Sequence, residues 1–311
     1  MKNLKNEIEK IKREKNAVIM AHYYTPGEVQ DIADFVGDSL ALAQKAAETS
    51  ADIIVLCGVY FMGETAKILC PDKKVLVLDK MAGCSLADSC DAEKFRKFIA
   101  EHPGHKVISY VNTSAAVKTL TDIVVTSSNA CQIVNSLPKD EKIIFGPDRN
   151  LGSYINYVTG RDMLLWDGAC HVHEKFDMEK IIELKKQYPE AKVLVHPECK
   201  GHVVKLADRV GSTAALLNYA IASDAKDFIV ATESGILHEM RKKAPEKNFI
   251  PAPPNDSFGC NECSYMKLNT MEKLLDVLQN ESNEVVVDAE TIERAKLPII
   301  RMLDISRELG L

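Results

Sequence analysis

Three cysteines occupy equivalent places in three successive copies of one sequence unit. They are Cys84, Cys170 and Cys263. Three thiolates from separate units could converge on one point and hold an iron–sulfur cluster with one iron left free. Such an iron is a Lewis acid able to bind a hydroxyl or carboxylate group and promote loss of water. With Cys260, the same cysteines could instead form a structural zinc site, although zinc sites usually draw ligands from close pairs and two of these cysteines stand alone.

A polar residue ends the first apolar run of each copy, and a second follows two positions later. The pairs are His22 and Tyr24, Tyr110 and Asn112, and His196 and Glu198. A lone histidine at a strand end is usually a structural residue, but three polar groups at equivalent positions favour a shared site. Together they offer acids, bases and hydrogen-bond donors.

Small hydroxyl side chains recur where helices are expected to begin, at Ser39, Ser127 and Thr213. Each alone is explained by helix capping. If the helices start at a common cavity, however, their free N–H groups favour phosphate or carboxylate. His173 follows Cys170 closely and is expected to reach the same cavity. The pattern predicts a small ligand with several negative charges.

The repeat consists of apolar runs that alternate with longer helical patterns. The first runs are residues 18–21, 107–109 and 193–195; the second are 52–56, 122–125 and 227–230; the third are 75–78, 143–145 and 249–250. Short apolar runs separated by helical segments such as 39–48 and 212–222 are typical of parallel strands with crossover helices. A cysteine loop is expected after each third run.

The predicted fold is α/β, with three homologous three-layer α/β/α domains whose small parallel sheets surround a pseudo-threefold axis. Ligands of open parallel sheets bind beyond the carboxyl ends of the strands, which places the active site at the centre. The expected domains are 1–83 with 270–311, 84–169 and 170–269. Helices at 269–279 and 288–309 should pack back onto the first unit. Three independent domains are the less favoured alternative because units of this size usually pack together.

Composition excludes several classes of protein. The 311 residues are 46% hydrophobic and 27% charged, with a formal net charge of −6 and no long block of one sign. A general nucleic-acid surface and a membrane span are therefore not expected. The first fourteen residues are too charged for a secretory signal, so the expected location is the cytoplasm. Nine cysteines there favour metal ligation, catalysis or burial over a disulfide framework.

Six segments resemble the quinolinate synthase family, the A protein of bacterial and archaeal NAD biosynthesis. They are residues 21–24, 34–39, 109–113, 125–130, 196–199 and 263–269. The resemblance runs nearly end to end. It implies condensation of iminoaspartate with dihydroxyacetone phosphate to give quinolinate, phosphate and water, and a functional link to the enzyme that supplies iminoaspartate.

The resemblance also assigns roles to residues of this chain. It implies a [4Fe–4S] cluster held by Cys84, Cys170 and Cys263. It implies substrate contacts at His22, Ser39, Tyr110, Asn112, Ser127, His173, His196, Glu198 and Thr213. It places catalytic proton transfer at Tyr24, Tyr110, His196 and Glu198.

Two departures from the family pattern are mild: position 23 is Tyr where some members carry Asn, and position 264 is Ser where Pro is common. Cys260 is similar to a family cysteine that is not a cluster ligand and could pair reversibly with Cys263. Two other functions stay open on the residues alone. One is a cluster-dependent hydro-lyase acting on a hydroxy-acid, and the other is a zinc-stabilised binding protein.

Overall fold

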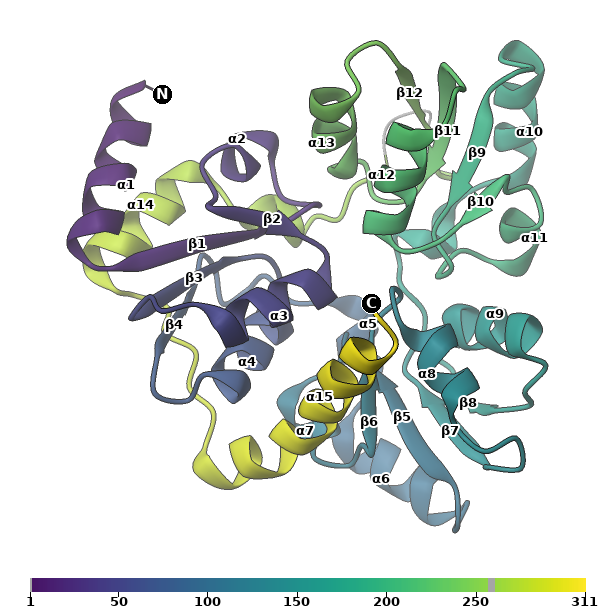
Figure 1. The fold of residues 1–311 in the computed structure, drawn as a ribbon, viewed down its shortest axis with the longest axis horizontal. Helices are drawn as coiled ribbons and strands as arrows, with labels where there is room; N and C mark the ends of the chain where they lie inside the picture. The colour runs from purple at the N-terminus through teal and green to yellow at the C-terminus, as the bar shows by residue number, and fades with distance from the viewer. Residues whose placement is uncertain (1, 257–260) are drawn as a thin grey trace.

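The computed structural model describes residues 2–256 and 261–311, and these form three separate four-stranded sheets (Figure 1). The first sheet contains β1 (Ala17–His22), β2 (Phe35–Gly37), β3 (Ile53–Cys57) and β4 (Lys74–Val77). The second contains β5 (Lys106–Tyr110), β6 (Ile123–Val125), β7 (Ile143–Gly146) and β8 (Leu164–Leu165). The third contains β9 (Lys192–Val195), β10 (Arg209–Val210), β11 (Asp227–Ala231) and β12 (Asn248–Pro251).

All three sheets share one topology. Their orders are β2-β1-β3-β4, β6-β5-β7-β8 and β10-β9-β11-β12, and neighbouring strands within each sheet are parallel. The predicted fold class is therefore confirmed. The domain boundaries given above stay a prediction.

The expected strand count was wrong, because each unit has four strands rather than three. The edge strands β2, β8 and β10 are only two or three residues long, too short to stand out as apolar runs. As a result the run at 122–125 is β6, the counterpart of β2 and not of β3. Each cysteine loop follows the fourth strand of its unit, not the third.

Helices cover the sheets. Those of the first unit are α1 (Lys2–Glu14), α2 (Gly27–Gln30), α3 (Ser39–Glu48) and α4 (Tyr60–Leu69). The second unit has α5 (Ser85–Asp88), α6 (Ala92–Ala100), α7 (Ala115–Lys118), α8 (Ala130–Ser136) and α9 (Arg149–Thr159). The third has η1 (His173–Lys175), α10 (Met178–Gln187), α11 (Gly201–Val204), α12 (Thr213–Ala222), α13 (Ile236–Lys243) and η2 (Met266–Leu268).

Two further helices, α14 (Met271–Asn280) and α15 (Ala289–Glu308), end the chain. As expected, α14 packs on the first unit, against α1. The longer α15 instead lies between the first two sheets and contacts α4, α7 and β6 (Figure 1). Its buried Ile299 and Met302 join a hydrophobic core that also contains Ile54 and Ile108. The two units thus share one core, which opposes independent movement of their sheets.

The three sheets surround a common centre (Figure 1). His22 ends β1, Tyr110 ends β5 and His196 directly follows β9, as the sequence predicts. No helix within residues 2–256 and 261–311 is both long and apolar enough to cross a membrane.

Candidate active site

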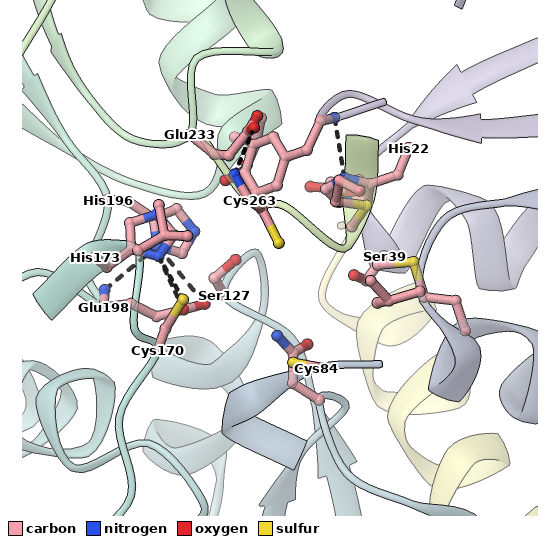
Figure 2. Close-up of a pocket in the computed structure, with 18 of the residues that line it drawn as sticks. His22, Ser39, Cys84, Ser127, Cys170, His173, His196, Glu198, Glu233 and Cys263 are labelled. Carbon is pink, nitrogen blue, oxygen red and sulfur yellow. Dashed lines mark hydrogen bonds and ion pairs between the residues drawn. The ribbon is translucent and has the colours of Figure 1, made fainter. Parts of the chain in front are cut away.

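A central pocket lies where the three units meet, and every predicted site residue lines it. These residues are His22, Tyr24, Ser39, Cys84, Tyr110, Asn112, Ser127, Cys170, His173, His196, Glu198, Thr213 and Cys263. Figure 2 shows the three labelled cysteines approaching this space from different directions. Parallel strands deliver these groups because their carboxyl ends all face the centre.

Each pocket cysteine stands at the start of a helical turn. Cys84 precedes α5, while Cys170 and Cys263 lie just before η1 and η2. The sulfur atoms accept backbone N–H groups from the turn that follows: Cys84 from Ala87, Cys170 from His173, and Cys263 from Met266. Such donors favour the thiolate form.

The cysteines are nevertheless hard to ionise without a cation. Burial, with a smaller contribution from the neighbouring Cys263, raises the pKa of Cys84 to about 12. Burial also raises the pKa of Cys170 and of Cys263. Three thiolates in this pocket therefore need positive charge between them, which the iron ions of a cluster would supply. The donor set fits such a group.

Two buried carboxylates hold the backbone of the cysteine loops. The Cys170 N–H donates to Asp148 Oδ2 at 3.2 Å, and the Cys263 N–H donates to Glu233 Oε1 at 3.1 Å. Lys267 pairs with Glu233 at 2.9 Å and also donates to the Tyr24 carbonyl at 3.0 Å. The Cys263 loop is therefore tied to the strand end that carries Tyr24.

A second, overlapping group could bind a single metal ion. One donor atom each from Cys170, His173 and Glu198 lies within 4.8 Å of the others. The geometry therefore offers a three-cysteine set and a mixed set that share Cys170.

One side of the pocket is a continuous hydrogen-bonded chain. The Tyr110 hydroxyl donates to Glu198 Oε1 at 2.6 Å, and Glu198 Oε2 lies 3.1 Å from His173 Nδ1. His173 Nε2 is 3.0 Å from Thr232 Oγ1, which is 2.8 Å from the Tyr24 hydroxyl. The Tyr24 hydroxyl also contacts Thr213 Oγ1 at 2.7 Å. We call this side the hydrogen-bonded wall and include His196, whose ring stacks on His173.

Electrostatics assign protonation states on this wall. Burial raises the pKa of Glu198, but the neighbouring His173 and His196 and the Tyr110 hydroxyl lower it more, so that it falls to about 2. Burial lowers the pKa of His196 and of His22 to about 3. Burial raises the pKa of Tyr24 and Tyr110 well above the usual value. Near neutral pH Glu198 is therefore a carboxylate, His196 a neutral imidazole, and Tyr24 and Tyr110 protonated phenols.

A second group of pocket residues, which we call the open wall, consists of Ser39, Asn112 and Ser127, of which Ser127 also hydrogen-bonds to Tyr110. Ser39 is the first residue of α3, as predicted, and Asp38 caps that helix by accepting the Ala41 N–H at 3.1 Å. The Asn112 Oδ1 atom is buried and has no hydrogen-bond partner among the described residues. A buried acceptor without a partner indicates a donor supplied by a ligand.

Two predicted helix starts on the pocket have different outcomes. Thr213 begins α12 and is capped by Ser212, as expected. Ser127 does not begin a helix, because α8 starts at Ala130 and Ser127 lies in the turn before it. The Thr126 N–H donates to Asn129 Oδ1 at 2.7 Å, which closes that turn and delays the helix.

The sequence interpretation missed Thr232, Glu233 and Asp148. Asp148 and Glu233 are equivalent, since each lies two residues after the third strand of its unit. The signal was present in the repeat. It was hidden because the short strands misaligned the second unit by one strand. Cys260 lies outside the described residues, so its pairing with Cys263 stays a prediction.

The chain matches known proteins over almost its whole length. The family model described as "Quinolinate synthetase A protein" matches residues 6–304. The chain belongs to this family. Quinolinate synthase from Microcystis aeruginosa is 57% identical over 299 residues, covering 96% of this chain and 94% of the relative. The Synechocystis enzyme of the same name is 54% identical over 305 residues, covering 98% and 96%.

A relative from a third organism gives the same result. Quinolinate synthase from Chloroherpeton thalassium is 53% identical over 306 residues, covering 98% of this chain and 95% of its own. Members of the quinolinate synthetase A family are thus similar to this chain across all three units, and the chain is an enzyme of NAD biosynthesis.

Proposed function

We propose that the chain is a quinolinate synthase that condenses iminoaspartate with dihydroxyacetone phosphate. The products are quinolinate, one phosphate and two waters, which balances the atoms of both substrates without net oxidation. The observation that carries the proposal is a pocket shared by three units, in which three single cysteines lie beside an acid–base wall and an open wall. Family membership supports the same reaction.

A [4Fe–4S] cluster is the proposed cofactor, held by Cys84, Cys170 and Cys263. When bound through three thiolates, it would supply one iron as a Lewis acid for loss of a hydroxyl group. The buried Asp148 and Glu233 hold two of the ligand loops through backbone N–H groups. Their proposed part is to keep the sulfur atoms directed into the pocket.

The substrates are small anions, and the open wall together with Thr213 suits them. Iminoaspartate has two carboxylates and the second substrate has a phosphate. Ser39 and Thr213 stand at the N-termini of α3 and α12, where free N–H groups and hydroxyls favour negative charge. Asn112 and Ser127 complete the proposed binding surface, and His22 lines the same pocket.

Proton transfer is proposed for the hydrogen-bonded wall. The condensation needs an isomerisation, imine formation and dehydrations, and each step moves protons at carbon, nitrogen or oxygen. The Glu198 carboxylate can accept a proton, and the Tyr24 phenol can donate one and recover it through Thr232 or Thr213. Tyr110 donates to Glu198 and orients its carboxylate, and His196 lies next to it.

The decisive experiment is anaerobic purification followed by assay with both substrates. We expect a brown protein with about four irons per chain and release of both phosphate and quinolinate. Colourless protein that contains zinc would favour the binding-protein alternative. A brown protein that releases no phosphate but dehydrates a hydroxy-acid would favour the hydro-lyase.

The ligand assignment needs its own variant. Cys84→Ala should lose the cluster absorbance and quinolinate formation together. A Cys84→Ala protein that keeps both would contradict the three-cysteine assignment and favour the mixed group of Cys170, His173 and Glu198. Ser136→Ala, at an exposed position that ends α8, is the control and should keep both signals.

The cellular setting follows from the proposed chemistry. A cluster enzyme that uses an unstable imine should work in the cytoplasm near the enzyme that supplies iminoaspartate. Oxidation that joined Cys260 to Cys263 would remove a cluster ligand and inactivate the enzyme. Full activity in a sample shown by mass spectrometry to carry that disulfide would contradict this regulation.

A further inference from the structure

The short helix after the first strand of each unit ends at an equivalent position. Gln30 is the last residue of α2, Lys118 is the last residue of α7, and Val204 is the last residue of α11. Each lies behind the strand end that carries a site residue: Tyr24, Asn112 and Glu198 respectively. The first two positions hold hydrogen-bond donors, and the third holds an apolar side chain.

The Gln30 side chain donates to the two carbonyl groups that flank Tyr24. Its Nε2 atom lies 2.9 Å from the Tyr23 carbonyl oxygen and 2.7 Å from that of Thr25. The same nitrogen lies 3.1 Å from the Gly235 carbonyl oxygen in the third unit. A Cβ on Gly235 would lie 2.7 Å from Tyr24 Cα, so the two backbones are in close contact. Gln30 is 1% exposed, so water cannot replace these contacts.

Lys118 makes the matching contacts in the second unit. Its Nζ atom lies 2.9 Å from the Val111 carbonyl oxygen and 2.5 Å from that of Thr113, the two groups that flank Asn112. The side chain is fully buried, and its ammonium lies 5.5 Å from the ring centre of Phe61. A buried ammonium is costly unless its donors are used. Here the Lys118 ammonium donates to the backbone carbonyl groups on both sides of Asn112.

We propose that Gln30 and Lys118 are positioning residues that orient Tyr24 and Asn112 by holding both adjacent peptide groups. Fixing the peptides on each side of a residue fixes the direction of its Cα–Cβ bond. The inference rests on the proposed function, since it concerns the same site. It goes further because neither residue lines the pocket and neither was singled out by the sequence pattern.

The third unit explains why Val204 needs no donor. Glu198 is held through its own side chain by Tyr110 and His173. Its carbonyl accepts the Asn150 Nδ2 amide at 3.1 Å from the second unit. The Asn112 Oδ1 atom has no partner among the described residues, and the Tyr24 side chain is hydrogen-bonded only at its hydroxyl, so contacts to the backbone help to set the orientation of both residues.

The test places the same side chain at the three equivalent positions: Gln30→Met, Lys118→Met and Val204→Met. A lost pair of hydrogen bonds should cost about tenfold or more in the step that uses the positioned group. Gln30→Met should lower kcat about tenfold with little change in KM. Lys118→Met should raise the KM for dihydroxyacetone phosphate about tenfold with a smaller change in kcat. Val204→Met, the matched control, should change neither.

Two further measurements separate positioning from general destabilisation. Hydrogen exchange followed by mass spectrometry should speed up in the peptide around residues 23–25 for Gln30→Met and around 111–113 for Lys118→Met. Gln30→Lys should restore most of the lost kcat, because an ammonium fills this role in the second unit. If Lys118→Met does not fold, the Gln30→Met and Gln30→Lys pair decides the question.

Several results would overturn the proposal. One is a Gln30→Met protein with wild-type kinetics and wild-type hydrogen exchange. Another is the same change of kcat and of KM in Gln30→Met as in Lys118→Met. The third is a Gln30→Lys protein whose kcat does not recover. Failure of the proposed function is a different result, namely a wild-type enzyme that makes no quinolinate. The exchange measurement would still test the positioning role in that case.

Discussion

The two walls of the central pocket differ in how their polar groups are satisfied. On the hydrogen-bonded wall, Tyr24, His173 and Glu198 contact one another directly or through Thr232. On the open wall, the Asn112 Oδ1 atom is buried and has no partner within the described part of the chain. The first wall is organised before any ligand arrives, whereas the second has capacity left for one.

This difference indicates a division of labour. A preorganised network holds proton donors and acceptors in fixed protonation states, which suits chemistry. Free acceptors and hydroxyls at helix N-termini suit binding of anions. Variants of the first wall should therefore affect kcat, and variants of the second should affect KM.

The largest effect is expected from Glu198→Gln, which keeps the shape of the side chain and removes its charge. General acid–base groups contribute about 100- to 10,000-fold, so kcat should fall about 1,000-fold. The kcat is measured from steady-state quinolinate formation. The control is Glu179→Gln at an exposed position on α10. A Glu198→Gln protein with a normal kcat and a raised KM would show that Glu198 acts in substrate binding, which contradicts the role given to the hydrogen-bonded wall.

Tyr24→Phe removes the hydroxyl shared with Thr213 and Thr232. We expect kcat to fall about 100-fold while KM stays within a few-fold, because the ring still fills its place. The control is Tyr157→Phe on α9, where the side chain is 86% exposed. Equal loss in both variants would show that the assay reports stability rather than chemistry.

The hydrogen-bonded wall should also make folding sensitive to acid. Burial lowers the pKa of His196 to about 3 from an ordinary value of 6.5. The free energy of unfolding is therefore unaffected above pH 6.5, the ordinary pKa that His196 has in the unfolded chain. It decreases as the pH falls from 6.5 towards 3, because over this range only the unfolded chain binds the proton. The loss between pH 7.5 and 5 should be roughly 2 kcal/mol.

Urea unfolding at the two pH values tests this prediction. His196→Asn should lose less stability than the wild type on acidification. His202→Asn, at an exposed position on α11, should behave as the wild type does. If His196→Asn shows the full acid loss, His196 does not titrate in the way proposed.

The smallest effects belong to the open wall. Ser39→Ala and Asn112→Ala should each raise KM about tenfold, since a hydrogen bond to a charged ligand contributes about 1.5–3 kcal/mol. Substrate titration of the initial rate measures this, and Ser136→Ala, at the exposed end of α8, is the control. A fall in kcat at constant KM would place these residues in the chemical step.

Much of this site could be predicted because a parallel α/β repeat sends its strand ends to one side. His22, Tyr110 and His196 were predicted from their place after an apolar run, and the pocket cysteines from their equivalent positions. Asp148 and Glu233 were missed for a local reason. Strands as short as Leu164–Leu165 give no recognisable apolar run. The runs of the second unit were therefore aligned one strand out of register with those of the other two units.

Other residues could not be predicted from local pattern. Thr232, in the third unit, contacts Tyr24 of the first unit as well as His173 of its own unit. The path of α15 between the first two sheets depends on which surfaces those units leave apolar.

The sequence by itself determined the repeat, the fold class and the residue types at the strand ends, because periodicity and spacing are local properties of the chain. Only the tertiary structure decided which of these groups contact one another. Partners such as Tyr24 and Thr232 lie far apart along the chain, and their hydrogen bonds exist only where separately folded units meet. Gln30 and Lys118 lie near the residues they hold along the chain, but only the structure revealed them, because the direction in which their side chains turn back onto the strand end depends on burial.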